Sequence, residues 1–513
     1  ADATLAQRHA ARLSAAGLSN VALQPTGSAA FAPPAVAAQP VKDRESYPAP
    51  AARPPPAEAT AKQSQPAVRS TKPAMPMMFA LGNSADAPRG SSSQAPITGV
   101  TWRAARLQAV SAAFTGHDRP ARHSQFLHAS GGLDWRPSAS IELRVAARGD
   151  GYRHQGWQDH SEIMLDYDEV YLRRRWSSLR LTMGAQRVLW GRVDEIPPTD
   201  HMSVTDLTRM ALDRLPQRRR TVPAVRAEWF GLPGKLDLVW IPAFRPAELP
   251  DEASPWHPVN RRDGRFLSLP SNALQTALIK AGRFDDDGSG SGGGGLRYSQ
   301  ELSAFDYAVS AQRVRHSTPY YELDPRVRTA LAGGSDVSSA VALAADTFVG
   351  RHPYTWVLGA DAGMVTGRTT WRAEAAWLSA APVTDGDGAL DTVNALHAVI
   401  GAEFYPGDRD LRVNLQLGSK HLFGPSSLLD RRQRYFTNGS VFFPLGQRRW
   451  EFETRYALGL NVRDVYVNPE LRYVFAEPHQ FYIAAHIFRG TQDTLGGFFH
   501  DNTGITLGWR SKL

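Results

Sequence analysis

The stretch Arg449-Trp450-Glu451-Phe452-Glu453-Thr454-Arg455-Tyr456-Ala457-Leu458 alternates bulky, mostly apolar side chains with charged or small ones at every second position. A period of two places the two sets of side chains on opposite faces of a β-strand. The same alternation recurs at 140–148, 371–377, 411–418 and 481–487. Many of these segments run for about 9–12 residues, which is long for a soluble sheet but suits a tilted strand that crosses a bilayer.

The connections between these segments alternate in length along the chain. Short turns are predicted near 136–138, 176–178, 231–234, 366–369, 406–410 and 476–479, and long connections at 150–165, 188–220, 245–295, 317–340, 380–392 and 421–434. Outer-membrane barrels have short periplasmic turns and long external loops. The sequence therefore predicts an all-β fold: a transmembrane antiparallel up-and-down β-barrel of about 16–18 strands. The alternating run from Ile505 to Leu513 is expected to pair with the first strand and close the sheet.

Composition excludes several other classes of protein. No run of about 18–20 uncharged apolar residues is present, so a membrane protein built from helices is excluded. The chain has no cysteine, which rules out disulfides, zinc–thiolate sites and iron–sulfur clusters. Lysine and arginine number 58 against 50 aspartates and glutamates, but no localised basic module is visible, so no nucleic-acid partner is expected.

Residues 1–95 differ from the rest in being rich in alanine and proline and poor in large apolar side chains. Such a segment cannot bury a core, so we predict a mostly disordered periplasmic extension at 1–95 and the barrel at 96–513. Two short islands interrupt it: Leu5–Leu18 can form a short amphipathic helix with a narrow, weakly apolar face, and Ala74–Phe79 is a small apolar patch. The extension is either a loose tail or an arm that docks a partner or enters the barrel mouth.

If apolar positions face lipid, their alternating partners face the lumen. Charges on the lipid face would each cost about 2–4 kcal/mol near the midplane, which favours the inward orientation. The predicted lumen and selectivity residues are Arg144, Arg148, Arg173, Arg175, Arg180, Arg226, Arg372, Arg412, Arg449, Arg455, Glu374 and Glu453. Arginine is always charged and binds carboxylate or phosphate, which suggests a lumen biased toward anionic or sugar-like solutes. The alternative is a packing ladder in which the arginines pair with interleaved acids.

The connection 188–220 carries an unusual mixture of charges. We predict that it folds inward and narrows the pore, with a short helix at Thr205–Leu215. Its candidate constriction residues are Asp194, Glu195, Asp200, Asp206, Arg209, Arg218, Arg219 and Arg220. The alternative is an external surface loop.

Signatures of enzymes and cofactors are missing from the sequence. The run Asp285–Gly295 formally contains a dinucleotide fingerprint, but no βαβ unit surrounds it, so it is predicted to be a flexible loop tip. Asp200-His201 and His352 are interpreted as incidental loop residues. The chain is predicted not to be an enzyme, and neither a cofactor nor a metal is expected.

Two motifs carry a resemblance to a known family. Trp190-Gly191-Arg192 ends a strand-like run and is followed by Ile196-Pro197-Pro198-Thr199-Asp200, and Gly359-Ala360-Asp361 precedes Trp371-Arg372-Ala373-Glu374-Ala375. Over about 97–513 the chain resembles a family of uncharacterised proteobacterial outer-membrane barrels that accompany RND-type exporters and are distantly similar to alginate-export porins. The resemblance implies a barrel fold and an exporter-linked role.

The first functional hypothesis is therefore an outer-membrane channel, porin-like or exporter-linked, that passes small anionic, glycan-like or amphipathic solutes. The alternative is a barrel anchor that recruits an envelope partner through residues 1–95. Expected partners are outer-membrane lipid and lipopolysaccharide, with a periplasmic or inner-membrane exporter component for the extension. The expected location is the bacterial outer membrane.

Overall fold

The structure is a computed structural model that describes residues 99–116, 121–156, 159–286, 288–386, 388–407, 410–445 and 449–511. The predicted extension at 1–95, including the islands Leu5–Leu18 and Ala74–Phe79, lies outside the described residues, as do Asp287 and Leu513.

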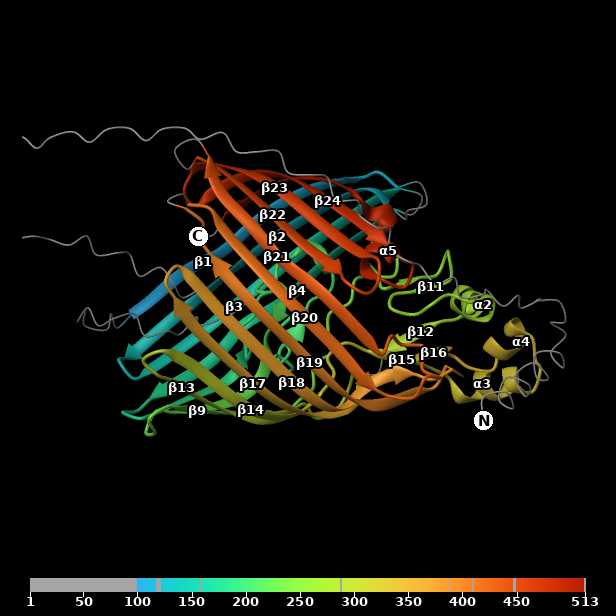
Figure 1. Cartoon of the computed structure of the whole chain (residues 1–513), viewed down its shortest axis with the longest axis horizontal. Coiled ribbons are helices and arrows are strands. Elements are labelled where there is room, and N and C mark those ends of the chain that lie inside the picture. Colours follow the sequence, from blue (N-terminus) through green and yellow to red (C-terminus); the bar gives the residue numbers. More distant parts are fainter. Residues whose placement is uncertain are drawn as a thin grey trace, which may run out of the picture. The chain divides into compact units, whose positions relative to one another are not determined.

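The described residues form one closed antiparallel barrel of 18 strands (Figure 1). Neighbours in sequence pair around the sheet, and β1 pairs with both β2 and β25, which closes it. The fold prediction is confirmed. The strands, in order around the barrel, are β1 (Gly99–Phe114), β2 (Ala121–Ser138), β3 (Ile141–Gly156), β4 (His160–Arg175), β5 (Leu179–Gln186), β8 (Val222–Trp229), β9 (Lys235–Ile241), β13 (Gly293–Glu301), β14 (Phe305–Arg315), β17 (Tyr354–Thr366), β18 (Thr369–Thr384), β19 (Leu390–Phe404), β20 (Arg412–Phe423), β21 (Gln433–Leu445), β22 (Trp450–Gly459), β23 (Asp464–Ala476), β24 (His479–Gly490) and β25 (Gly504–Ser511).

The two ends of the barrel differ in their connections. At the turn end, where β1 begins and β25 ends, the links are short, such as 139–140, 176–178 and 477–478. At the opposite loop end, 187–221, 242–292 and 316–353 are long. Two predicted long connections are wrong: 150–165 and 380–392 are mostly strand, because their alternating polar residues belong to an inner face that sequence reading took for loop.

The glycine-rich run predicted as a flexible tip is also partly strand. Residues 284–286 form β12 (Phe284–Asp286), and β13 begins at Gly293. Gly293 has a φ of +127°, and a Cβ there would lie 2.2 Å from the Arg313 carbonyl oxygen. Glycine is therefore needed for the close approach of β13 and β14, which a loop prediction does not anticipate.

Short elements cover the loop end. They are β10 (Val259–Asn260), β11 (Arg265–Phe266), α2 (Ala273–Ala281), β12, β15 (Tyr320–Leu323), α3 (Pro325–Ala332), α4 (Val337–Val341), β16 (Phe348–Arg351), α5 (Leu495–Phe498) and η2 (His500–Asn502). Among the described helices, none has the length and apolar character needed to span a membrane. Trp256, from the 242–292 connection, packs against Phe114, Phe488 and Phe499 near the line where β25 meets β1.

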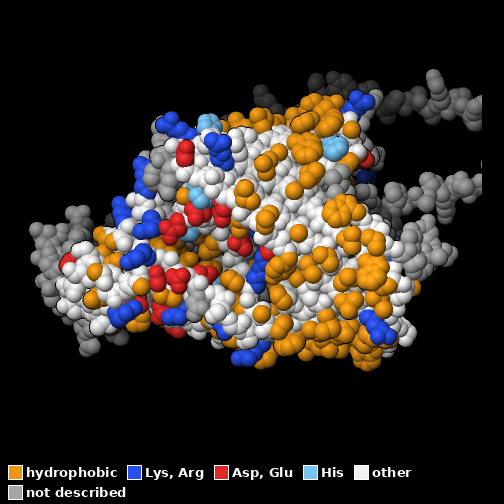
Figure 2. Space-filling view, turned by 180° about the vertical axis from the view of Figure 1, so that it is seen from behind, with side chains coloured by type: hydrophobic (Ala, Val, Ile, Leu, Met, Phe, Trp, Pro, Cys, Tyr) orange, Lys and Arg blue, Asp and Glu red, His pale blue; other side chains and the backbone are white. Residues whose placement is uncertain are grey.

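The outer wall is apolar. Figure 2 shows hydrophobic side chains spread over the wall, with charged ones gathered toward the loop end. On β17, Trp356, Leu358 and Met364 are exposed, while Val357 and Asp361 are buried, so the alternation separates an outer face from an inner one. The nine residues from Trp356 to Met364 are separated by eight steps of about 3.4 Å, so they span about 27 Å along the strand, or about 20 Å once a tilt near 40° is included. That height suits a membrane-spanning band.

The interior holds a second, smaller core. Trp190 and Val188, from the connection after β5, are fully buried against the inner-face residues Val239, Val357 and Leu378. The Trp190 indole nitrogen donates to Asp237 at 3.1 Å. The connection 187–221 therefore occupies part of the lumen.

Candidate functional site

The candidate site is the lumen together with the segment 187–221, which we call the inner segment. It contains β6 (Val204–Thr205), η1 (Met210–Leu212) and β7 (Arg219–Arg220), and β6 pairs with β7. The predicted helix at Thr205–Leu215 is wrong, since only the single 3-10 turn forms. Asp206 accepts hydrogen bonds from the Thr208 amide and hydroxyl, and such local bonds compete with a helix start.

Glu374, on β18, anchors one end of the inner segment. Its carboxylate accepts from the amides of Arg192 (2.8 Å), Val193 (3.1 Å) and Thr199 (2.7 Å), and from the Thr199 hydroxyl (2.7 Å). The Arg192 guanidinium donates to Asp361 at 2.8 Å and pairs with Asp306. Glu374 is buried, so the structure places it as the receptor for the segment rather than as a group that lumen water meets.

Asp194 and Glu195 lie at the tip of this anchored stretch. Asp194 accepts from the Asn414 amide at 2.6 Å and lies 3.5 Å from Arg372, and its side chain is 43% exposed. Glu195 pairs with Arg218 at 2.8 Å and lies 3.9 Å from Arg455. Desolvation by the surrounding protein raises the pKa of the Asp194 carboxyl, and the Arg372 charge opposes that shift. These two carboxylates face the lumen toward the turn end.

A buried ionic network holds the other side of the inner segment. Arg220 donates to Asp206 at 2.9 Å and to Asp166 at 2.6 Å, and Arg148 lies 3.2 Å from Asp206. Burial disfavours the charged form of Arg220, but Asp206, Glu248 and Asp166 outweigh this and raise its pKa. The remaining predicted residues of the segment also have partners, since Arg219 pairs with Asp200 at 2.6 Å and Arg209 with Asp213 at 2.5 Å.

The predicted wall arginines mostly make ion pairs or polar contacts. Their partners are Asp134 and Glu169 for Arg144, Asp150 for Arg148, Glu142 for Arg173 and Arg175, Glu228 for Arg180, Asp237 for Arg226, Glu403 for Arg372, Asn468 for Arg455 and the Phe442 ring for Arg412. Glu453 receives Arg214 of the inner segment. Arg449 lies exposed in the turn before β22, outside any strand. This is the ladder that the sequence left open as an alternative.

Pairing changes which charges lumen water meets. Arg103, Arg136 and Arg175 remain about half exposed on β1, β2 and β4 at the turn end. Across the lumen, Asp194 and Asp306 are the more exposed partners of their pairs. Sequence analysis missed Arg103, Arg136 and Asp306, although each lies at an inward position of an alternating run. We call the half-exposed Arg103, Arg136 and Arg175 the basic wall, and the partly exposed Asp194 and Asp306 the acidic wall.

The histidines considered for catalysis have structural contacts. The His352 ring bonds to Asp286 and to the His316 carbonyl, both at 2.7 Å. Burial lowers the pKa of His201 to about 3, and its ring packs 6.1 Å from that of His316. Within the described residues, no group of three or more His, Asp or Glu side chains could hold a metal ion.

No protein-family model and no curated protein sequence matches the chain. Solved structures with a similar strand arrangement include Acinetobacter baumannii OccAB1 (TM-score 0.46, 8% identity, 82% of this chain and 99% of that one) and OccAB4 from the same organism (0.45, 10%, 81% and 98%). Salmonella typhi OmpF, solved in complex with daunomycin, gives 0.40 and 8% over 81% of this chain and 97% of that one. Because all three TM-scores are below 0.5, these similarities add no argument to the strand pairing described above.

Proposed function

We propose that the chain is an outer-membrane channel in which the inner segment narrows a polar lumen, and that it passes small anionic or glycan-like solutes. One observation carries the proposal: Glu374 fixes the inner segment across the lumen by four hydrogen bonds, which leaves Asp194 partly exposed opposite a row of arginines. An apolar exterior around a polar interior is the architecture of a membrane pore.

The two walls suggest how a solute is oriented. A carboxylate or phosphate would meet Arg103, Arg136 and Arg175, because guanidinium groups bind such anions with planar geometry. Hydroxyl groups of a glycan would donate to Asp194 and Glu195 on the opposite side. Rings and rows of this kind set preference in pores.

Reconstitution into planar bilayers tests this proposal. We expect stepwise single-channel currents in KCl, because the lumen is lined by charged groups rather than by a continuous apolar core. A variant lacking residues 1–95 should conduct at least as well. A folded barrel that carries no current in either form, and none after Glu374→Ala releases the inner segment, would contradict the channel function.

The exporter link is a separate part of the proposal. It comes from the resemblance of the motifs near 190–200 and 359–375, and it assigns residues 1–95 to a periplasmic or inner-membrane partner. Affinity purification of the full chain should then bring down an envelope protein that is lost when residues 1–95 are removed. Equal recovery with and without these residues would contradict an arm that recruits a partner.

A further inference from the structure

The barrel wall has a step between β4 and β5. All but a few residues of β4 pair with β3, from Ile141 opposite Arg174 to His154 opposite His160. On its other side, β5 pairs only with Val170–Arg175. In the described part of the chain, no strand pairs with residues 160–169 of β4 on that side, and β8 begins only at Val222. Toward the loop end, the ladder of backbone hydrogen bonds around the barrel is therefore interrupted.

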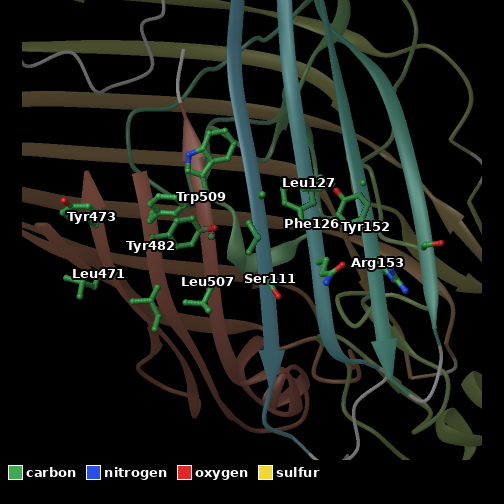
Figure 3. A pocket seen from close by; sticks show the side chains of 18 of the residues that line it. Ser111, Phe126, Leu127, Tyr152, Arg153, Leu471, Tyr473, Tyr482, Leu507 and Trp509 are labelled. Carbon is green, nitrogen blue, oxygen red and sulfur yellow. The ribbon is translucent and has the colours of Figure 1, made fainter. Parts of the chain in front are cut away.

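The outer face beside this step is apolar. Leu165 and Ile163 are 83% and 81% exposed, the highest values among the large hydrophobic side chains that the structure describes. A groove of about 1220 Å³ runs from Ile163 across β3, β2 and β1 to Trp509 on β25 and Trp450 on β22. Figure 3 shows part of its lining, with Leu127 and Tyr152 on the strands near the start of the barrel and Leu507 and Trp509 on its last strand. A hydrocarbon chain lying in this groove would reach the step.

Side chains take the place of the missing ladder. Asp166 receives Arg220 at 2.6 Å and also Arg245, and Asp168 receives Arg187. We call these five residues the β4 latch. Arg245 also stacks on the Tyr167 ring, with 4.8 Å to the centroid, and the Thr221 hydroxyl donates to the Asp168 carbonyl at 3.0 Å.

The latch differs from a strand ladder in how it can open. Ion pairs exchange partners through side-chain rotation alone, whereas a ladder opens only when backbone groups lose their hydrogen bonds, which is costly in lipid. An incoming anion can replace an aspartate in front of an arginine without leaving that arginine unpaired. Figure 2 shows charged side chains around a hollow at the loop end, beside the apolar wall.

We propose that the step between β4 and β5 is a lateral portal through which a single-chain amphiphile with an anionic head group passes between the lumen and the outer leaflet. The tail follows the apolar groove to Ile163 and then passes the exposed side chain of Leu165, which lies outside the groove. The anionic head group replaces Asp166 or Asp168 as the ion-pair partner of one of the three latch arginines. The proposal rests on the membrane location given under Proposed function, and it adds a second route out of the lumen.

Accessibility from the membrane tests the portal, and a chain without cysteine suits the experiment. Single cysteines replace Asp168 inside the latch, Leu165 on the lipid face and Arg297 on β13. Arg297 is the matched control, because its side chain is 16% exposed against 15% for Asp168 and β13 is paired on both sides. N-dodecylmaleimide in the bilayer should label Leu165→Cys and Asp168→Cys at least tenfold faster than Arg297→Cys. A water-soluble maleimide should label the two inward positions similarly. Equally slow labelling of positions 168 and 297 by dodecylmaleimide would overturn the portal.

Cross-linking then tests passage. In the double variant Asp168→Cys/Arg187→Cys, a short bifunctional thiosulfonate cross-links the two cysteines and so closes the latch. The control pair Leu172→Cys/Met183→Cys joins two residues of β4 and β5 that are already paired in the sheet. In proteoliposomes, the same double variant is compared before and after cross-linking, so that any effect of replacing Arg187 in the inner segment is present in both states. Cross-linking should slow transfer of NBD-labelled lysophosphatidylglycerol at least fivefold without a further change in KCl conductance, while the control cross-link changes neither. Unchanged lysolipid transfer after closure would overturn the portal with the channel intact, whereas loss of all KCl current in uncross-linked protein would overturn the proposed channel instead.

Discussion

The wall at β17 and β18 and the inner segment at 187–221 use similar residue types but are held together in different ways. In the wall, each side chain faces lipid or lumen according to a period of two, and backbone pairing fixes the register, with Asp361 opposite Glu374. In the inner segment, no period applies, and position is set by bonds to distant residues such as Asp361 and Glu374 themselves. The strand pairing of the wall should therefore survive change at single inward positions, whereas the position of the inner segment depends on a few buried acceptors such as Glu374.

Glu374→Ala should give the largest effect. It removes the acceptor of four hydrogen bonds, three of them from backbone amides, and leaves buried donors without a partner. At about 1–3 kcal/mol for each such group, the stretch 192–199 should detach from β18. We expect a several-fold larger single-channel conductance while the barrel stays folded in detergent. The lipid-facing neighbour change Ala373→Val is the control and should leave conductance unchanged.

A charge on the outer wall is the complementary test. Ala360 lies outward on β17, midway between Trp356 and Met364. Ala360→Arg should lower the free energy of unfolding in vesicles by about 2–4 kcal/mol, because arginine at the midplane loses its hydration. Ala360→Val should lower it much less. A loss no larger for arginine than for valine would mean that this face does not meet hydrocarbon.

Protonation of His201 should weaken the inner segment moderately. Burial holds its pKa near 3, below the unfolded value of about 6.5, so the folded state binds fewer protons. The contribution of neutral His201 to the free energy of unfolding is complete above pH 6.5, and it is lost as the pH falls from there toward 3. Between pH 7 and 5.5 the loss should be about 1 kcal/mol. Urea unfolding of wild type and His201→Asn at both pH values isolates the part of this loss that comes from His201. An identical pH dependence of the free energy of unfolding in the two proteins would show that His201 does not cause it.

Ion selectivity should show the smallest change. Asp194→Asn removes a partly exposed carboxylate from the acidic wall, and Arg175→Ala removes a half-exposed guanidinium from the basic one. Reversal potentials in a KCl gradient should shift the chloride-to-potassium permeability ratio up about twofold in the first variant and down about twofold in the second. Shifts in the same direction would argue against two walls of opposite charge.

The difference between the two regions also explains what sequence could predict. Alternation at 371–377 and 411–418 predicted strands, and the structure has β18 and β20 there. Sequence analysis also placed Arg372 and Arg455 inward, because a charge facing lipid is costly. Local pattern could not show that Glu374 serves as a receptor, since its four donors lie about 180 residues away. The helix predicted at Thr205–Leu215 failed because Asp206 and Thr208 bond to each other, a contact that helical periodicity does not record.

The same limit applies to charge. Counting arginines suggested a basic lumen, but an arginine that lies against Asp134 or Glu228 contributes little net field. The charge that the lumen presents to water depends on which partner of each ion pair is more exposed, and tertiary packing decides this. Asp194 is exposed because its stretch of chain ends near the turn end, whereas Asp206 is enclosed between Arg148 and Arg220.

The aromatic cluster around Trp256 has a consequence for assembly. Its indole contacts Phe114 at the end of the first strand and Phe488 and Phe499 near the last one, so a residue from the interior of the chain bridges both termini of the sheet. The complete cluster can form only once the first and last strands have met, because Trp256 contacts residues near both of them. Completion of this aromatic cluster and closure of the barrel are then a single event. A barrel whose first and last strands have not yet paired would leave the cluster incomplete, with its aromatic rings open to the surroundings.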